Sequence, residues 1–210
     1  SSDLVNKALE AQSLTLPFTS RETVSSLMID RCKVFDSNAH PLLLCFQSSP
    51  IMKMKCTKFI FKVGDNLLQD MLTLQMFKLM DILWKKSGID FRLTIYNVLA
   101  TSTTSGIIQF VQDSETVNSI QTRGRGVTGV FNDACIYEWI KVKNPEPKSL
   151  ERAIENFTYS CAGYCVATYV IGVGDRHNDN IMVDKDGHLF HIDFGHFLGN
   201  IIKLGFYSKR

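Results

Sequence analysis

The last part of the sequence carries the pattern that most restricts the fold, because an apolar segment, a polar loop and a hairpin follow one another directly. Residues 150–171 are apolar enough to predict a long buried helix. The polar turn Asp-Lys-Asp-Gly at 184–187 separates two apolar runs, which predicts a β-hairpin over 181–192. Since a hairpin returns the chain to its starting point, Asn180 and Asp193 are predicted to lie side by side.

Composition excludes several classes of protein. The 210 residues are 45% hydrophobic and 21% charged, which is ordinary for a folded domain and argues against disorder. The formal net charge of +2 gives no reason to expect a nucleic-acid partner. The six cysteines show neither a C-x-x-C pair nor zinc-finger spacing, and several lie in apolar runs. They are therefore predicted to be free thiols in a reducing, intracellular compartment.

The first half of the chain predicts a β-rich lobe. Residues 1–20 are mixed and polar and are interpreted as a linker from an upstream domain, since the chain does not begin with Met. Short apolar runs bounded by turn residues predict strands at 24–29, 42–46, 57–63, 91–100 and 107–111. Between them, a helix over 66–86 is predicted by an apolar stripe formed by Leu68, Met71, Leu72, Leu79, Ile82 and Leu83. The expected structure is a five-stranded antiparallel sheet with one inserted helix.

The second half predicts a helical lobe. Helices are expected over 113–121, 134–143 and 150–171, and the hairpin follows them. The uncharged window 156–174 has the length of a membrane span, but its hydroxyl, amide and glycine residues favour a helix buried in a protein core. The fold class is therefore α+β, with lobes at 21–112 and 113–210 that join near residues 109–114.

The polar loop and the end of the hairpin carry the chemistry. Asp175 and Asn180 have the spacing D-x-x-x-x-N, which is that of the Asp and Asn in a kinase catalytic loop. Mg²⁺ prefers oxygen ligands, so the Asn180 amide and the Asp193 carboxylate are the predicted metal ligands. Asp175 or His177 would then lie where an attacking hydroxyl loses its proton. The pattern predicts phosphoryl transfer from ATP with Mg²⁺.

Three further features have both a functional and a plainer interpretation. Lys62 ends an apolar strand and is predicted to bind the ATP phosphates, with Asp70 as a possible ion-pair partner. The segment 124–129 matches G-x-G-x-x-G, but it follows a predicted helix instead of a strand, so it is interpreted as a loop. His188, His191 and His196 lack the spacing of a metal site and are expected to be ordinary hydrogen-bonding residues.

These residues resemble the catalytic domain of phosphoinositide 3-kinases. The resemblance is carried by residues 61–72, 160–168, 174–182 and 190–200, and it covers residues 21–210. The order Asp-Arg-His at 175–177, reversed from the His-Arg-Asp of protein kinases, is specific to the lipid-kinase group. The resemblance implies a two-lobed fold of the PI3/PI4-kinase type, with an antiparallel-sheet N-lobe and a helical C-lobe. The C-lobe is expected to be truncated, because the chain stops inside the activation segment.

The resemblance also implies roles for individual residues. Those expected to act in catalysis are Asp175, Arg176 and His177. Those expected to bind Mg²⁺ are Asn180 and Asp193. Those expected to bind ATP are Ser37, Lys62, Asp70, Tyr96, Gln109, Phe110, Val111, Met182 and Ile192. Those expected to bind the lipid head group are Lys203, Lys209 and Arg210.

The implied function is class I-like transfer of the ATP γ-phosphate to the 3-hydroxyl of phosphatidylinositol 4,5-bisphosphate. The implied partners are a phosphoinositide membrane and an SH2-containing regulatory subunit, with a cytoplasmic protein recruited to the plasma membrane or endomembranes. Only three cations follow Asp193, which keeps a class II enzyme as the second hypothesis. A non-catalytic fragment that binds nucleotide or a partner is the third hypothesis, and a protein kinase has less support.

The sequence departs from the family pattern at four positions. Asn66 and Leu68 replace an acid and an arginine, Gln109 replaces the hinge glutamate, and Ala39 stands where many class I enzymes have a phosphate-loop lysine. Adenine recognition at the hinge uses backbone groups, so the change at Gln109 is expected to matter little. The change at Ala39 is expected to weaken one electrostatic contact with phosphate.

Overall fold

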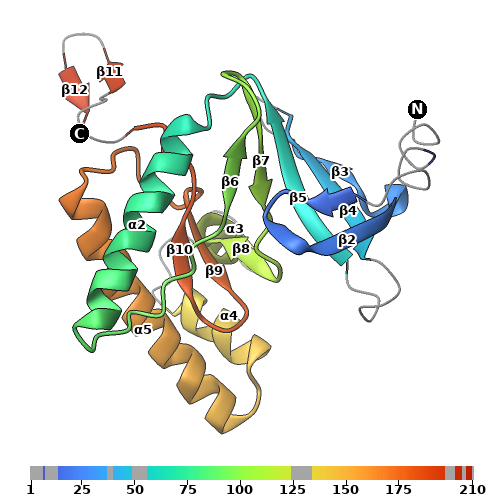
Figure 1. The fold of residues 1–210 in the computed structure, drawn as a ribbon. Helices are drawn as coiled ribbons and strands as arrows, with labels where there is room; N and C mark the ends of the chain where they lie inside the picture. Colours follow the sequence, from blue (N-terminus) through green and yellow to red (C-terminus); the bar gives the residue numbers. More distant parts are fainter. Residues whose placement is uncertain are drawn as a thin grey trace. The chain divides into compact units, whose positions relative to one another are not determined.

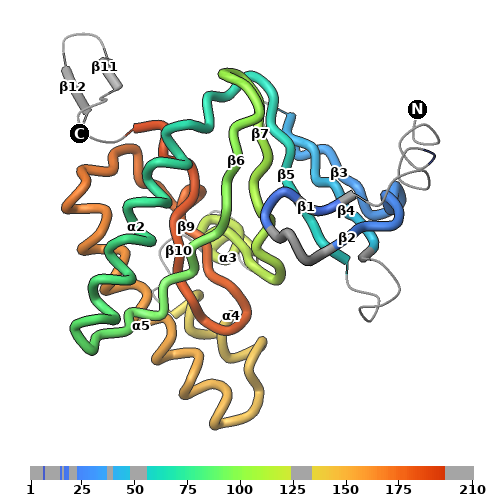
Figure 2. Tube along the Cα trace, viewed as in Figure 1, coloured from blue at the N-terminus to red at the C-terminus, as the bar shows by residue number. Residues whose placement is uncertain are grey.

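The computed structural model describes residues 7, 14–36, 40–48, 56–123, 134–196, 202–204 and 207–209. The chain divides into two compact units. The first unit contains residues 1–71 and 96–110, and the second contains residues 72–95 and 111–210. Figures 1 and 2 together label their helices and strands. The chain passes from the first unit to the second for the last time at Phe110–Val111, which falls in the expected hinge.

The first unit is built on a seven-stranded antiparallel sheet with the order β1-β2-β4-β5-β7-β6, in which β3 also pairs with β4 (Figure 1). Its elements are β1 (Leu14–Leu16), β2 (Thr19–Leu27), the 3-10 turn η1 (Ile29–Arg31), β3 (Lys33–Val34), β4 (Leu42–Ser48), β5 (Cys56–Val63), β6 (Val98–Ala100) and β7 (Ser105–Gln109). Val24 and Phe59 form the centre of a buried cluster against this sheet, to which Phe18 and Phe46 add aromatic contacts.

The sheet differs from the prediction in two ways. Part of the predicted linker 1–20 forms β1 and the start of β2, and the short β3 was not predicted. The predicted strand 91–100 was wrong for 91–97, where only Val98–Ala100 pairs as β6. Residues 91–94 instead pack on the second unit's helix α5 (Pro147–Val170), because Gly163 admits Phe91 and Leu93 and the Tyr164 hydroxyl donates to the Thr94 carbonyl over 2.6 Å.

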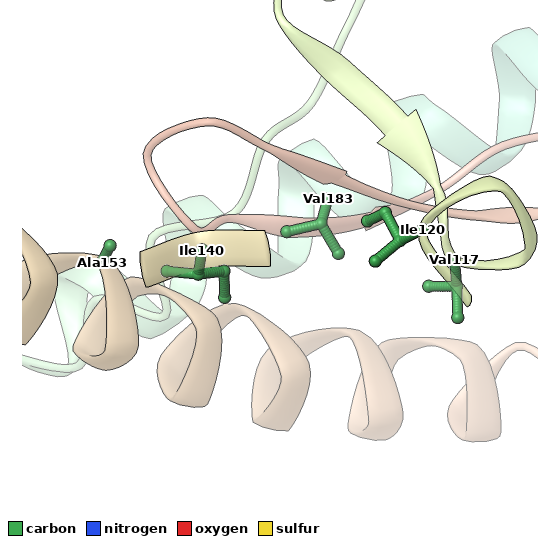
Figure 3. Close-up of a cluster of buried hydrophobic side chains, with 5 residues drawn as sticks. All are labelled: Val117, Ile120, Ile140, Ala153 and Val183. Carbon is green, nitrogen blue, oxygen red and sulfur yellow. The ribbon is translucent and has the colours of Figure 1, made fainter. Parts of the chain in front are cut away.

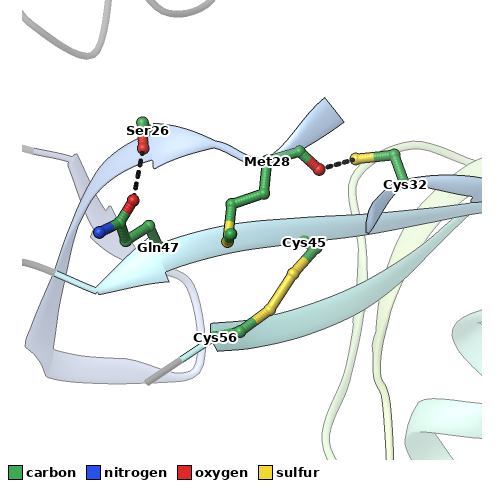
Figure 4. Close-up of a disulfide and its surroundings, with 6 residues drawn as sticks. All are labelled: Ser26, Met28, Cys32, Cys45, Gln47 and Cys56. Carbon is green, nitrogen blue, oxygen red and sulfur yellow. Dashed lines mark hydrogen bonds between the residues drawn. A yellow bond between two sulfur atoms is a disulfide. The ribbon is translucent and has the colours of Figure 1, made fainter. Parts of the chain in front are cut away.

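A disulfide joins Cys45 of β4 to Cys56 of β5, with a Cα–Cα distance of 6.2 Å (Figure 4). The strand register explains the pair: Cys45 lies opposite Lys58 and Cys56 lies opposite Gln47, so the two cysteines are diagonal neighbours on one face of the sheet. The prediction that all six cysteines are free was therefore wrong for these two. Among the residues described, the free thiols are those of Cys32, Cys135, Cys161 and Cys165.

The second unit combines helices with a three-stranded antiparallel sheet of order β10-β9-β8. Its elements are most of α2 (Leu68–Lys86), β8 (Ser114–Thr116), α3 (Val117–Thr122), α4 (Cys135–Lys143), α5 (Pro147–Val170), β9 (Ile181–Asp184), β10 (Leu189–His191) and the separate pair β11 (Ile202–Leu204) and β12 (Tyr207–Lys209). The predicted hairpin is confirmed as β9–β10, which Figure 2 shows as one continuous red-orange loop of chain.

Two boundaries in this unit differ from the prediction. Helix α5 begins at Pro147, three residues before the predicted start, because proline fits the first position of a helix, where its missing N–H is not needed. Strand β8 was not predicted. It is only three residues long, too short for a periodic signal, and it forms because Glu115 pairs with Val183 of the hairpin.

The core of this unit lies between α3, α4, α5 and β9. Its buried residues are Val117, Ile120, Ile140, Ala153 and Val183, which Figure 3 shows gathered in one cluster. Helix α5 buries a stripe of mostly small residues on one side, including Ser160, Gly163 and Ala167, while Tyr169 on the other side is exposed. The predicted buried helix is thus buried on one face. No helix among the described residues has the length and apolar character needed to cross a membrane.

Helix α2 buries a different face from the predicted one. Of the predicted core stripe, Met71 is partly buried and the other members are exposed, namely Leu68, Leu72, Leu79, Ile82 and Leu83, whereas Phe77 is completely buried. Apolar residues occupy most positions of this helix, so their spacing alone cannot select the buried face. The face that packs is the one carrying Phe77, whose ring contacts the rings of Tyr164 and Phe194 edge-on.

Candidate active site

The polar loop 174–180 links α5 to β9 in the second unit. The Gly174 amide donates to the His196 carbonyl over 2.7 Å, which ties the start of the loop to the segment after β10. Asp175 has a φ of 53°, an unusual conformation for a residue with a side chain. Asp175 and His177 are both exposed. The two predicted catalytic groups are therefore accessible to a reactant.

Asn180, by contrast, is buried at the end of the loop. Its amide nitrogen Nδ2 donates to the Asp175 carbonyl over 2.9 Å and lies 3.0 Å from Nε2 of His177. Its backbone carbonyl accepts a hydrogen bond of 3.0 Å from the Ile192 amide. Because the side-chain contacts of Asn180 use its nitrogen, its oxygen Oδ1 is turned toward a different side, as a metal ligand requires.

Asp193 follows the hairpin directly and is exposed, with a φ of 61°. The Ile192 amide is bonded to the Asn180 carbonyl, so Asn180 lies opposite Ile192, the residue directly before Asp193. The structure thus brings together the two ends of the hairpin as the sequence predicts. Their shared binding of one ion stays a prediction. Among the residues described, no group of three or more His, Cys, Asp or Glu side chains could hold a metal.

Arg176 connects the loop to the hairpin. Its guanidinium donates to four backbone carbonyls: those of Gly174, Asn180, Ile192 and Asp193. It also lies over the Phe194 ring, 5.5 Å from the ring centre. With these bonds directed at the protein's own backbone, Arg176 has the contacts of a positioning residue and holds the Asn180 and Asp193 backbones together.

The segment under Asp193 is buried and aromatic. Phe194 is completely buried against Phe77, and His191 stacks on Tyr164 with 5.1 Å between ring centres. Burial and the nearby Arg176 charge lower the pKa of His191 to about 4, so its ring is neutral near pH 7. Burial also raises the pKa of Tyr164 above its usual range. These uncharged, buried rings pack under the end of the hairpin and stabilise it.

Met182 and Ile192, the predicted floor of the adenine site, are both partly buried on the hairpin. The register pairs Met182 with Phe190, and Ile192 is bonded to Asn180. Residues two apart on a strand share a face, so Met182 and Ile192 lie on the face that carries Asn180. The placement is compatible with the predicted role.

The first unit holds the remaining predicted ATP-binding residues except Val111, which belongs to the second unit. Lys62 on β5 forms an ion pair of 3.4 Å with Asp65, a partner that the sequence did not suggest. Asp70 and Tyr96 are both buried. The Asp65 carboxylate beside Lys62 is compatible with the predicted role of this lysine in phosphate binding. Predicting Asp65 as its partner would have required knowing that the chain turns after Val63.

The predicted hinge residues are fixed by local contacts. Gln109 accepts hydrogen bonds from both the backbone amide and the side chain of Asn97, at 3.0 and 2.9 Å. The Phe110 amide donates to the Lys58 carbonyl over 3.2 Å. In the second unit, the Val111 carbonyl accepts from the Ser114 hydroxyl over 2.7 Å. The side-chain oxygen of Gln109 is thus bonded within the first unit, and the role of these residues in nucleotide recognition stays a prediction.

Several predicted residues are not described. Ser37 and Ala39 of the expected phosphate-covering loop, residues 124–129 and Arg210 lie outside the described residues. Lys203 and Lys209 lie in β11 and β12, but only their backbone is described. Of the expected phosphate loop, the closing contact is visible: the Phe35 amide donates to the Pro41 carbonyl over 2.9 Å.

Sequence reasoning missed two residues that contact the loop. Asn118 and Gln121 of α3 form hydrogen bonds with Asp179 and Asn178. In the sequence, these two polar residues are three positions apart, and each directly follows an apolar residue, Val117 or Ile120. This pattern was the only signal available. That signal is typical of any amphipathic helix and does not say what its polar face contacts.

Comparison with known proteins supplies the family. Residues 56–207 match the phosphatidylinositol 3- and 4-kinase family. Phosphatidylinositol 3-kinase 3 of Dictyostelium discoideum is 48% identical over 191 residues, which is 89% of this chain and 11% of that protein. The phosphatidylinositol 4-phosphate 3-kinase C2 domain-containing subunits alpha of Pongo abelii and beta of Homo sapiens are 43% and 45% identical over 209 and 193 residues.

These two matches cover 100% and 92% of this chain but 12% of each relative, so the chain spans about a tenth of the length of the curated relatives it matches. The family match nevertheless covers well over half of the chain, and it includes the loop 174–180, the hairpin and Asp193. The chain belongs to the phosphatidylinositol 3- and 4-kinase family.

Proposed function

We propose that this chain is the nucleotide-binding and catalytic part of a phosphatidylinositol 3-kinase, which transfers the γ-phosphate of ATP to the 3-hydroxyl of an inositol lipid. The observation that carries the proposal is the junction of the polar loop and the hairpin, where Arg176 holds the backbones of Asn180 and Asp193. The 3-kinase names of the similar proteins support the position of the hydroxyl.

Mg²⁺ and ATP fit the residues present. Asn180 turns its Oδ1 away from the atoms that its Nδ2 contacts, and Asp193 carries an exposed carboxylate beside it in the fold. Two oxygen ligands suit Mg²⁺, which keeps several waters and takes the rest of its shell from phosphate. When bound, the ion would neutralise charge on the phosphates during transfer.

The loop residues then have distinct tasks. Asp175 or His177, both exposed, would accept the proton of the lipid hydroxyl as its oxygen bonds to the γ-phosphorus. The bond from that phosphorus to the bridging oxygen breaks, and ADP leaves. Asn180 restrains His177 through the 3.0 Å contact with its Nε2. Lys62, on the first unit, would bind phosphate oxygens.

The test is transfer of labelled phosphate from ATP to vesicles that contain phosphatidylinositol, its 4-phosphate or its 4,5-bisphosphate, with the position of the new phosphate determined on the product. The complete protein is expected to form 3-phosphorylated lipid, and residues 1–210 alone little or none. Products phosphorylated only at the 4-position, or transfer to peptides in preference to lipids, would overturn the proposal. Nucleotide binding without any transfer would support a non-catalytic fragment.

The preferred lipid divides class I-like from class II-like function. A class I-like enzyme, the first expectation from the sequence, would prefer the 4,5-bisphosphate. A specific observation favours a class II-like enzyme, because two of the similar proteins are named as 3-kinases of phosphatidylinositol 4-phosphate. Comparing initial rates on the two lipids in the same vesicles decides between them, since each class predicts the opposite order.

The proposal also includes a location and a partner. We expect the protein in the cytoplasm, recruited to the plasma membrane or endomembranes, with an SH2-containing regulatory subunit. Both expectations rest on the family resemblance in the sequence. Imaging of the tagged protein, and its co-purification with phosphotyrosine-peptide-binding proteins, would test them. A protein that is never recruited to these membranes and that retains no such subunit would contradict both.

A further inference from the structure

Helix α3 contacts the loop 174–180 through three hydrogen bonds. The Asn118 backbone amide donates to the Asn178 carbonyl over 2.9 Å, and Nδ2 of Asn118 donates to Oδ1 of Asp179 over 2.9 Å. Nδ2 of Asn178 donates to Oε1 of Gln121 over 2.7 Å. Asn178 and Asp179, the two residues between His177 and Asn180, are therefore both hydrogen-bonded to α3.

The local sequence makes α3 suitable for this contact. Val117 and Ile120 are buried in the core cluster and fix the helix against Val183 (Figure 3). Asn118 and Gln121 each follow one of these residues by one position, so they share the neighbouring face of the helix. The Thr116 hydroxyl caps the Ser119 amide, and the Asn178 carbonyl satisfies the Asn118 amide, which has no partner within the helix.

The two sides of the loop are held differently. On the hairpin side, Arg176 and the bond from Ile192 to Asn180 fix the loop to β10. On the opposite side, Asn178 and Asp179 depend on α3. Because they lie between His177 and Asn180 in the chain, a shift of these two residues displaces both a predicted catalytic group and a predicted metal ligand.

Asp179 links Asn118 to His177. Its Oδ1 accepts from Asn118, and its Oδ2 lies 4.0 Å from Nδ1 of His177. Its backbone amide lies 3.3 Å from the same ring nitrogen. Asn118 therefore orients the carboxylate that lies beside the imidazole ring, so its effect on His177 passes through Asp179.

We propose that Asn118 and Gln121 are positioning residues for phosphoryl transfer, which hold the segment Asn178–Asp179 so that His177 and Asn180 keep their reactive orientation. The inference rests on the proposed function. The hydrogen bonds are exposed, so they add little to global stability, but a small displacement at a reacting centre strongly lowers the rate. Loss of either side chain therefore reduces turnover much more than it reduces stability.

The experiment measures kcat and KM for ATP in the complete protein with phosphoinositide vesicles. Asn118→Ala and Gln121→Ala are each expected to lower kcat by about tenfold, as for other residues that orient a site's ligands, with KM changed less than about twofold. Thr122→Ala is the matched control, because the Thr122 hydroxyl bonds to carbonyls of its own helix. This control is expected to keep the parent's kcat.

A charge exchange provides a second test. Asn118→Asp alone places two carboxylates at hydrogen-bonding distance and is expected to lower kcat more than Asn118→Ala does. Combining Asn118→Asp with Asp179→Asn restores a hydrogen bond of reversed direction, so the double variant is expected to match Asp179→Asn alone. The inference is overturned if Asn118→Ala and Gln121→Ala keep kcat within twofold of the parent, or if the double variant is clearly slower than Asp179→Asn alone.

Hydrogen exchange separates failure of this inference from failure of the proposed function, since it needs no activity. Asn118→Ala is expected to speed exchange of the amides of residues 177–180 by about tenfold, while amides of β4 and β5 keep their parent rates. Unchanged exchange in the loop overturns the positioning role even in an active enzyme. If exchange in the loop becomes faster but the protein has no lipid-kinase activity, the contact between α3 and the loop is supported and the proposed function is rejected.

Discussion

Nη1 of Arg176 donates to the Ile192 carbonyl over 2.7 Å, so a loop residue and the last residue before Asp193 are joined directly, 16 positions apart in the chain. The same guanidinium reaches the carbonyls of Gly174, Asn180 and Asp193. One side chain thus fixes four backbone positions on both sides of the predicted metal site. This explains how exposed residues such as Asp193 can be held in place without burial.

Two substitutions of Arg176 should distinguish the contribution of its planar guanidinium from the contribution of its positive charge. Arg176→Ala should destabilise the protein by about 2 kcal/mol, because several charge-assisted hydrogen bonds to mostly partly buried carbonyls are lost. Arg176→Lys keeps the charge but not the planar fork, so it should recover less than half of that stability and little of the activity. Urea unfolding and lipid-kinase rates measure both effects. Full recovery by lysine would show that charge alone matters.

Gly187 in the hairpin turn should tolerate no side chain. Its φ is 89°, and an added Cβ would clash with the Ala153 carbonyl oxygen on α5. Gly187→Ala is expected to cost at least about 3 kcal/mol of unfolding free energy, since backbone must move. Gly172→Ala is the control, because its φ of 62° is similar but nothing lies within 4 Å.

The control variant should lose only about 1 kcal/mol, the usual penalty for a left-handed residue with a Cβ. Equal losses of unfolding free energy in the two glycine variants would show that backbone conformation, and not the close approach of α5 to the hairpin, sets the requirement at Gly187.

His191 should make stability depend on pH. Its pKa is about 4 in the folded protein and about 6.5 when unfolded, so the unfolded chain binds more protons between these values. The contribution of His191 to stability is therefore fully present above pH 6.5 and is lost as the pH drops toward 4. The contribution of His191 amounts to a loss of about 2 kcal/mol between pH 7 and pH 5.

His191→Phe keeps a ring to stack on Tyr164 but cannot be protonated. Its unfolding free energy should fall less than the parent's between pH 7 and pH 5, by that same difference, because the carboxylates titrate alike in both proteins. Chemical unfolding at the two pH values provides the measurement. Parallel pH profiles for variant and parent would contradict the assigned burial of a neutral ring.

The hairpin and the loop were predictable because their signals are local. The turn at 184–187 sets the hairpin, and the hairpin alone dictates that Asn180 and Asp193 approach each other. The residues that hold the loop were not predictable. Asn118 lies 61 positions from Asp179, and Arg176 acts through backbone carbonyls that any residue possesses, so neither contact leaves a pattern in one sequence.

The misread elements share a second cause, which is tertiary packing. The apolar leucines on α2 have helical spacing, but Phe77 on another face makes the buried contacts. Residues 91–94 have the composition of a strand, but Gly163 and Tyr164 on α5 provide a surface for them instead. The disulfide between Cys45 and Cys56 similarly follows from the register of β4 and β5, and their sequence spacing of 11 residues gives no hint of it.

The most direct measurement asks whether Asn180 and Asp193 bind one divalent ion with nucleotide. Thermal unfolding of the complete protein is compared with and without ATP, each with Mg²⁺ and with a chelator. Asp186→Ala is the matched control, because Asp186 is an exposed carboxylate at the opposite end of the same hairpin. At saturating nucleotide, near 100 times Kd, the parent and this control should gain about 3 kcal/mol of stability with Mg²⁺.

Asn180→Ala and Asp193→Ala should each lose most of that Mg²⁺-dependent gain, and the double variant should lose no more than the worse single variant, because both side chains serve one ion. Stabilisation by Mg²⁺ and ATP that stays at the parent's level in both single variants would contradict a shared metal site at the end of the hairpin.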